Sequence, residues 1–216
     1  MQKGASQHPN KVALMHTGEG DKRGRFRAAV LDLLKDIKDD DWIYWCPDDK
    51  YPIWLDQRIA WQAFESLDKM PFNIAGLCIA NRKTHERPQA AAKAIKKLSL
   101  GRCVFTARQD YKRIWLHQFL RARVIRHLFE GFPEVIWPPK SMDDLHKQIK
   151  YPDSCSRYII DKNAMVLGES THRGLITANC AKSLQMYQGI PEGFEISNQH
   201  IIIGRRPWSS RLTSLF

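Results

Sequence analysis

The sequence predicts an α/β fold: a mainly parallel, mixed sheet flanked by helices, formed as one domain over residues 1–216. Short apolar runs alternate with segments of helical periodicity, and this alternation is typical of βαβ units. A chain of 216 residues with 43% hydrophobic content suffices for one domain with a packed core. We therefore expect a single α/β domain.

The first predicted unit is a strand, a helix and a second strand. Residues 12–16 form an apolar run, and from Arg25 to Ile37 apolar side chains recur at helical spacing. Residues 42–46 are aromatic and β-branched, and Pro47 ends this run because proline cannot donate to a sheet ladder. The crossover predicts that residues 42–46 form a central strand parallel to the first.

The rest of the chain continues the alternation of helices and strands. Apolar periodicity, glycine and proline positions set the expected boundaries. We expect helices at 53–70, 89–98, 110–130, 141–150 and 177–187, strands at 72–80, 102–106 and 200–203, and a hairpin of 157–160 with 164–167.

Two adjacent carboxylates, Asp48 and Asp49, follow the strand at residues 42–46 directly. Open α/β sheets bind ligands at the carboxyl ends of their strands, so this is the expected place for a site. Paired carboxylates suit Mg²⁺ or Mn²⁺, which in turn hold diphosphate groups. The alternative is a solvated acidic turn, since Pro-Asp-Asp is also turn chemistry.

The charge balance favours a polyanionic partner. The chain has 34 Lys and Arg against 23 Asp and Glu, a net charge of +11, which attracts nucleic acid, anionic membrane surfaces or nucleotide phosphates. Basic side chains crowd the helix expected at 110–130, as a solvated face or as an anion-facing or membrane-facing surface. With seven tryptophans available for base stacking, a nucleic-acid-binding protein is the alternative function.

Cysteine usage and hydropathy favour a cytoplasmic protein. The five cysteines are scattered without CxxC or zinc-ligand spacing, which is typical of reduced thiols. No apolar run approaches the ~18 residues of a membrane span, and residues 1–10 lack a signal-peptide pattern. We expect a cytoplasmic chain, with peripheral contact to an anionic membrane as a further option.

Two segments carry a family resemblance. Arg25-Phe26-Arg27-Ala28-Ala29-Val30-Leu31, Trp42-Ile43-Tyr44-Trp45-Cys46 and Asp48-Asp49-Lys50-Tyr51 together resemble the donor-binding part of family-2-like bacterial glycosyltransferases with the GT-A fold. Val166-Leu167-Gly168-Glu169-Ser170-Thr171-His172-Arg173-Gly174-Leu175-Ile176-Thr177, with Gly189-Ile190-Pro191, looks like the closing segment of some members. Only one predicted strand precedes Arg25, so the resemblance begins after the family's first nucleotide-binding βαβ unit.

The resemblance implies transfer of a sugar from a nucleotide-diphosphate donor to a hydroxyl of a glycan or lipid-linked acceptor. It implies Mg²⁺ or Mn²⁺ on Asp48 and Asp49, which would neutralise the leaving diphosphate. An inverting enzyme also needs a carboxylate base. A non-catalytic remnant of the same fold is a further alternative. The resemblance implies donor binding by Arg25, Arg27, Lys50 and Tyr51, and Glu169 as the base, with Asp110 and Asp153 as other candidates.

Overall fold

The α/β class is confirmed by the computed structural model, which shows a mixed six-stranded sheet together with helices. The described residues form two compact units, one of residues 25–41 and 122–151 and the other within 42–121 and 152–203. Each unit is described by itself below. The expectation of one domain stays a prediction. The structure describes residues 25–47, 49–80, 96–101, 103–107, 114–187, 189–190 and 192–203.

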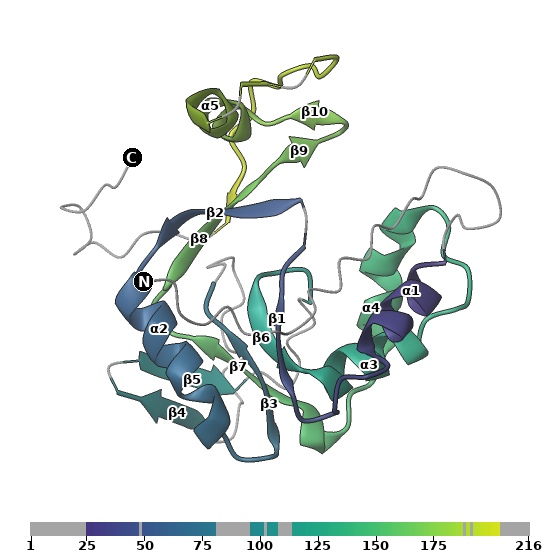
Figure 1. The fold of residues 1–216 in the computed structure, drawn as a ribbon, viewed down its shortest axis with the longest axis vertical. Helices are drawn as coiled ribbons and strands as arrows, with labels where there is room; N and C mark the ends of the chain where they lie inside the picture. The colour runs from purple at the N-terminus through teal and green to yellow at the C-terminus, as the bar shows by residue number, and fades with distance from the viewer. Residues whose placement is uncertain are drawn as a thin grey trace, which may run out of the picture. The chain divides into compact units, whose positions relative to one another are not determined.

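The first unit is helical. It contains α1 (Phe26–Leu34), α3 (Ala122–Glu130), the short 3₁₀ turn η3 (Pro139–Ser141) and α4 (Met142–Gln148), and α1 lies against α3 (Figure 1). The buried side chains of α3 recur at helical spacing, as expected of one apolar face packed on a neighbour. They are Ala122, Val124, Ile125, Leu128 and Phe129.

The acidic residues after α1 hold the first turn of α3. The carbonyls of Asp41 and Asp39 accept the backbone N–H groups of Ala122 (2.9 Å) and Arg123 (3.0 Å). Arg123 also pairs with the carboxylate of Asp40. Because a helix N-terminus favours negative charge and needs acceptors for its free N–H groups, this placement stabilises α3. The arginines of the predicted basic face are therefore partly used inside the fold.

The second unit is built on a six-stranded sheet in which only β3 and β7 pair in parallel. The expectation of mainly parallel pairing is wrong for the described strands. β1 lies at the edge of this sheet, not at its centre, within the part of the chain that the structure describes; residues 12–16 lie outside that part. The order is β1 (Trp42–Trp45), β6 (Gln118–Arg121), β3 (Ile74–Cys78), β7 (Ser156–Ile160), β5 (Cys103–Ala107) and β4 (Lys97–Leu100).

The antiparallel strand β6 is the reason for this difference, because it inserts between β1 and β3. Sequence periodicity predicted one helix over 110–130, but helix α3 begins only at Ala122 and residues 118–121 form β6. The basic residue of β6 is buried: Arg121 donates to the carbonyls of Ile74 (3.0 Å) and Met70 (3.1 Å) and lies over the Trp42 ring. The prediction placed such residues on a solvated, anion-facing or membrane-facing surface, whereas Arg121 is buried.

A three-stranded antiparallel sheet completes the second unit: β11 (Ile202–Ile203), β8 (Met165–Glu169) and β2 (Lys50–Leu55). The helix predicted from residue 53 starts later, as α2 (Gln57–Glu65), followed by η2 (Leu67–Lys69). Asp56 sets this start, since its carboxylate accepts the N–H groups of Arg58 and Ile59. The predicted hairpin is wrong, because β7 and β8 enter different sheets.

The remaining elements are one 3₁₀ turn, two strands of two residues each and one further helix. Within the predicted helix at 89–98, residues 97–98 belong to β4 and residues 89–95 lie outside the described part.

No helix in the described ranges has both the length and the apolar character needed to cross a bilayer. The last elements are η4 (Asp153–Cys155), β9 (Thr171–His172), β10 (Leu175–Ile176) and α5 (Ala178–Tyr187).

Arg126 should contribute more to stability than the carboxylate it pairs with. Its guanidinium donates to the carbonyls of Ile37 (2.8 Å) and Leu34 (3.3 Å) besides contacting Asp39. We expect Arg126→Ala to lower the free energy of unfolding by about 1–2 kcal/mol, because two carbonyls lose a charged donor. Asp39→Ala should cost less than about 0.5 kcal/mol, since that pair is exposed.

Urea denaturation measures both variants. Lys35→Ala is the matched control, because it removes an exposed ion pair with Asp32 and touches no carbonyl of the α1–α3 junction. Equal losses for Arg126→Ala and Lys35→Ala would contradict the role given to the carbonyl bonds.

Candidate functional site

The carboxyl ends of β1, β3 and β7 lie at one edge of the six-stranded sheet. β1 and β3 are each antiparallel to β6, so they run in the same direction, and β7 is parallel to β3. The segment that leaves β1 carries Asp49 and Lys50 to this edge and continues into β2. Asp48 lies outside the described residues.

Lys50 is the centre of the candidate site. Its ammonium group lies 3.0 and 2.8 Å from the two carboxylate oxygens of Asp49, and 3.9 Å from Oε1 of Glu169. The Lys50 side chain is only 11% exposed, whereas that of Asp49 is 48% exposed. Lys50 and Glu169 are register partners in the β2–β8 pair. Two segments distant in the sequence thus meet at one cation between two carboxylates.

Backbone hydrogen bonds fix both carboxylate-bearing residues. The carbonyl of Asp49 accepts from the N–H (2.8 Å) and the hydroxyl (3.2 Å) of Ser170. The hydroxyl of Thr177, which is fully buried, donates to the carbonyl of Glu169 at 2.5 Å. Because these bonds hold the chain on both sides of the site, the site is set by strand pairing and not by a free loop.

A buried histidine supports Lys50 from the sheet side. His117 contacts the carbonyl of Lys50 through Nε2 (2.8 Å) and the hydroxyl of Tyr44 through Nδ1 (2.9 Å). A carbonyl only accepts, so we assign the proton to Nε2 and take Nδ1 as the acceptor of the Tyr44 hydroxyl. Burial lowers the pKa of His117 and raises the pKa of Tyr44 to about 12, so both groups are neutral near pH 7.

Tyr51 lies on the other face of β2 from Lys50, since neighbouring residues of a strand alternate. Its hydroxyl accepts a hydrogen bond from Asn179 of α5 at 2.7 Å, and burial raises the pKa of Tyr51. Gly168 stands opposite Tyr51, where an added Cβ would lie 2.6 Å from the Asn179 amide nitrogen. Tyr51 therefore packs β2 against α5, and its predicted donor-binding role stays a prediction.

The other predicted site residues belong to other segments of the chain. Arg25 precedes α1 and Arg27 lies within it, so both belong to the helical unit. Asp153 begins η4 just before β7, which places it at the opposite edge of the sheet from the carboxyl end of β1. Asp110 lies outside the described residues. Among the candidates for the base, Glu169 is the described carboxylate that contacts Lys50.

The side chains at the candidate site supply only part of a ligand set for a metal cation such as Mg²⁺. Among the residues that the structure describes, no three His, Cys, Asp or Glu side chains gather as a metal site. Asp49 and Glu169 nevertheless bring two carboxylates to one positive group, the Lys50 ammonium. Carboxylate oxygens are the ligands that Mg²⁺ and Mn²⁺ prefer, so Asp49 has the chemistry for such an ion, and the other predicted ligand, Asp48, lies outside the described residues.

Comparison of the chain with known protein families, curated proteins and solved structures found no match. No protein-family model matches the chain, and neither a curated protein nor a solved structure matches it. The functional argument therefore depends on the residues of this chain.

Acid should destabilise the protein through His117. Because burial lowers the pKa of His117 below its ordinary value of 6.5, the unfolded chain takes up this proton first as the pH falls. The free energy of unfolding should therefore decrease below about pH 6.5, and the loss should stop growing once the pH passes the folded pKa. His117→Gln keeps an amide that can donate to the Lys50 carbonyl but does not titrate.

We expect urea denaturation at about pH 7.5 and about pH 5.5 to show a smaller acid loss for His117→Gln than for the wild type. Parallel losses in the two proteins would mean that His117 is not the group responsible.

Proposed function

We propose that this chain is a glycosyltransferase that transfers a sugar from a nucleotide-diphosphate donor to an acceptor hydroxyl. The observation that carries the proposal is the pairing of Lys50 with Glu169 across β2 and β8. It joins the two segments whose sequences resemble the family, and it puts an ammonium group and two carboxylates in one place. Inverting transfer from a nucleotide sugar needs both a cation for the diphosphate and a carboxylate base.

Each residue of the site has a role in this proposal. Lys50 stabilises the negative charge that grows on the leaving diphosphate, and Glu169 accepts the proton of the acceptor hydroxyl. Asp49, with Asp48, would hold Mg²⁺ or Mn²⁺, which supplies further positive charge to the diphosphate. Arg25 and Arg27 remain proposed donor-binding residues.

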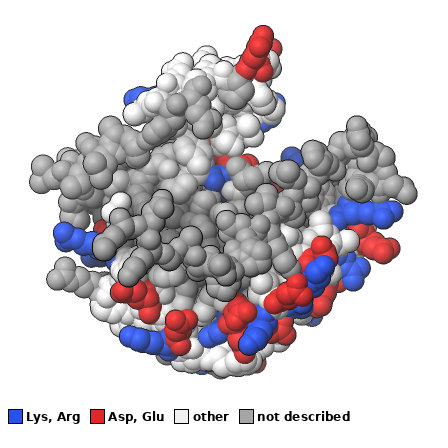
Figure 2. All heavy atoms as spheres, in the orientation of Figure 1, with Lys and Arg blue, Asp and Glu red and all other residues white. Residues whose placement is uncertain are grey.

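Nucleic-acid binding is supported less well. The helix on which this alternative was based is shorter than expected, and Arg123 and Arg126 pair with Asp40 and Asp39. The described residues carry 19 Lys and Arg against 18 Asp and Glu, so ten of the eleven net positive charges lie in the other segments. On the face drawn in Figure 2, the described acidic and basic side chains are interspersed.

Thermal melting with a metal and a nucleoside diphosphate tests donor binding. We expect Mg²⁺ or Mn²⁺ together with UDP, GDP or CDP to raise the melting temperature more than either component alone, because a ligand of the folded state stabilises it. Asp49→Asn should remove most of this synergy. Asp153→Asn is the matched control, since its carboxylate lies at the opposite edge of the sheet.

The same experiment separates the alternatives. Stabilisation by a single-stranded oligonucleotide that is independent of metal and lost with salt would indicate nucleic-acid binding. No shift with either ligand would favour a non-catalytic protein.

Glu169→Gln should separate catalysis from donor binding. Loss of a general base lowers turnover by about 10²–10⁴-fold, so release of nucleoside diphosphate from a nucleotide sugar should fall by that factor. The melting shift with metal and nucleoside diphosphate should persist, because Lys50 and Asp49 are unchanged. Full activity in this variant would remove Glu169 from the mechanism.

A further inference from the structure

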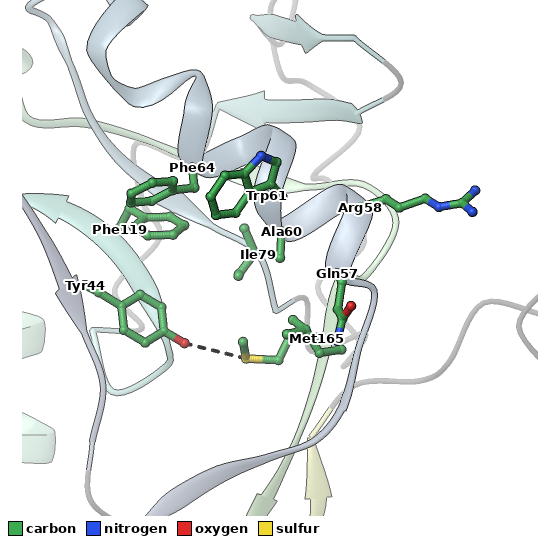
Figure 3. Close-up of a pocket in the computed structure, with 10 residues that line it drawn as sticks. Tyr44, Gln57, Arg58, Ala60, Trp61, Phe64, Ile79, Phe119 and Met165 are labelled. Carbon is green, nitrogen blue, oxygen red and sulfur yellow. Dashed lines mark hydrogen bonds between the residues drawn. The ribbon is translucent and has the colours of Figure 1, made fainter. Parts of the chain in front are cut away.

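The sheet unit contains an apolar cavity of about 730 Å³ beside α2. Figure 3 shows the rings of Trp61 and Phe64 on α2 next to those of Phe119 and Tyr44 on the sheet. The ring centroids of Phe64 and Phe119 are 6.2 Å apart, and those of Tyr44 and Phe119 are 5.2 Å apart. Four of the ten residues that line the cavity are thus aromatic.

Large apolar side chains at this cavity are exposed to solvent. Trp61 is 61% exposed and Phe64 is 52% exposed, and Leu55 and Tyr44 are also exposed. Exposed apolar surface around a concavity of this size is typical of a ligand site. The polar groups among the lining residues are few: the Tyr44 hydroxyl, which is bonded to His117, and the side chains of Gln57 and Arg58.

The cavity and the candidate site share the same two strands. Leu55 and Met165 are register partners that line the cavity, while Lys50 and Glu169 are register partners at the site. Met165 and Glu169 lie on the same face of β8, four residues and about 13 Å apart. Tyr44 also joins the two places, since its hydroxyl bonds to His117, which bonds to the Lys50 carbonyl.

We propose that this cavity binds the hydrocarbon chain of a lipid-linked acceptor, whose hydroxyl-bearing head lies at Glu169. This inference rests on the glycosyltransferase function proposed above and chooses between the two acceptor classes. A glycan needs many hydrogen-bonding groups to replace its water, and this lining offers few, whereas a hydrocarbon chain needs none.

The outer end of the cavity fits a membrane surface. The guanidinium of Arg58 points away from the ring cluster in Figure 3, and the exposed ring of Trp61 lies on the same helix. Tryptophan is enriched at membrane interfaces, and arginine complements anionic lipid headgroups. The hydrocarbon chain would therefore enter the cavity from the α2 side. The basic face predicted at 110–130 is not one helix, since residues 118–121 form β6 and α3 begins at Ala122.

Binding of a fluorescent single-chain probe, 11-(dansylamino)undecanoic acid, to the full chain tests the cavity directly. We expect saturable binding by the wild type and at least tenfold weaker binding by Ala60→Phe, because Ala60 lines the cavity and the new ring fills it. Glu65→Phe adds the same ring at an exposed position of α2 outside the lining and should bind like the wild type. The metal–nucleotide melting shift should be unchanged in Ala60→Phe.

A competition series gives a second measurement that needs no variant. Hexyl, octyl and decyl phosphate should displace the probe with affinities that rise at least tenfold from the first to the last, because each added methylene buries apolar area. An oligosaccharide should not compete. Equal potency of the three phosphates, or equal probe binding by Ala60→Phe and the wild type, would overturn the hydrocarbon site.

Two further outcomes separate this inference from the proposed function. A dimer that is lost in Ala60→Phe, without any binding of the probe, would assign the cavity to contact with a second copy and overturn the inference. Suppose that the probe binds and that longer alkyl phosphates displace it better, but that metal and nucleotide cause no melting shift. That outcome would overturn the transfer reaction and the acceptor role, while supporting hydrocarbon binding by the cavity.

Discussion

The antiparallel pairing of β2 with β8 is the constraint on which both the candidate site and the apolar cavity depend. One end of this pair holds Lys50 beside Glu169, and the other end holds Leu55 beside Met165 at the apolar cavity. Alternate residues of a strand face opposite sides, so a slip of one residue would move Glu169 and Met165 to the wrong face together. The register therefore sets the polar site and the cavity at the same time.

Buried and half-buried polar groups around β2 and β8 explain why the position of these two strands is well defined. His117 joins the carbonyl of Lys50 to the hydroxyl of Tyr44, and so ties the start of β2 to β1. On the other face, Asn179 donates to Tyr51 and accepts from the N–H of Ile201, which ties α5 to β2 and to the segment before β11. Buried polar groups are costly unless bonded, so these networks favour one arrangement of the strands.

The sequence predicted the elements whose pattern is local. Helix α1, strands β1 and β3 and helices α4 and α5 follow from periodicity, glycine and proline. It failed for β6, because Arg121 is buried by carbonyls that are distant in the sequence, and no local pattern reports such partners. Asp49 was found from its place after a predicted strand, and Lys50 and Glu169 through the resemblance, whereas His117 had no signal of its own inside a segment predicted to be helical.

If the proposed function holds, the charges of the site give a reason for a cation and an anionic ligand to bind there together. The described part of the candidate site has one ammonium, that of Lys50, and two carboxylates, those of Asp49 and Glu169. A diphosphate alone would therefore meet more negative than positive charge there. Asp49 already uses both carboxylate oxygens on Lys50. If Asp49 turned to a divalent cation, the Lys50 ammonium would keep its longer contact with Glu169 and could also face the diphosphate, so both positive groups would act on the same leaving group. The local charge balance thus gives a reason for cooperative binding that the +11 of the whole chain does not.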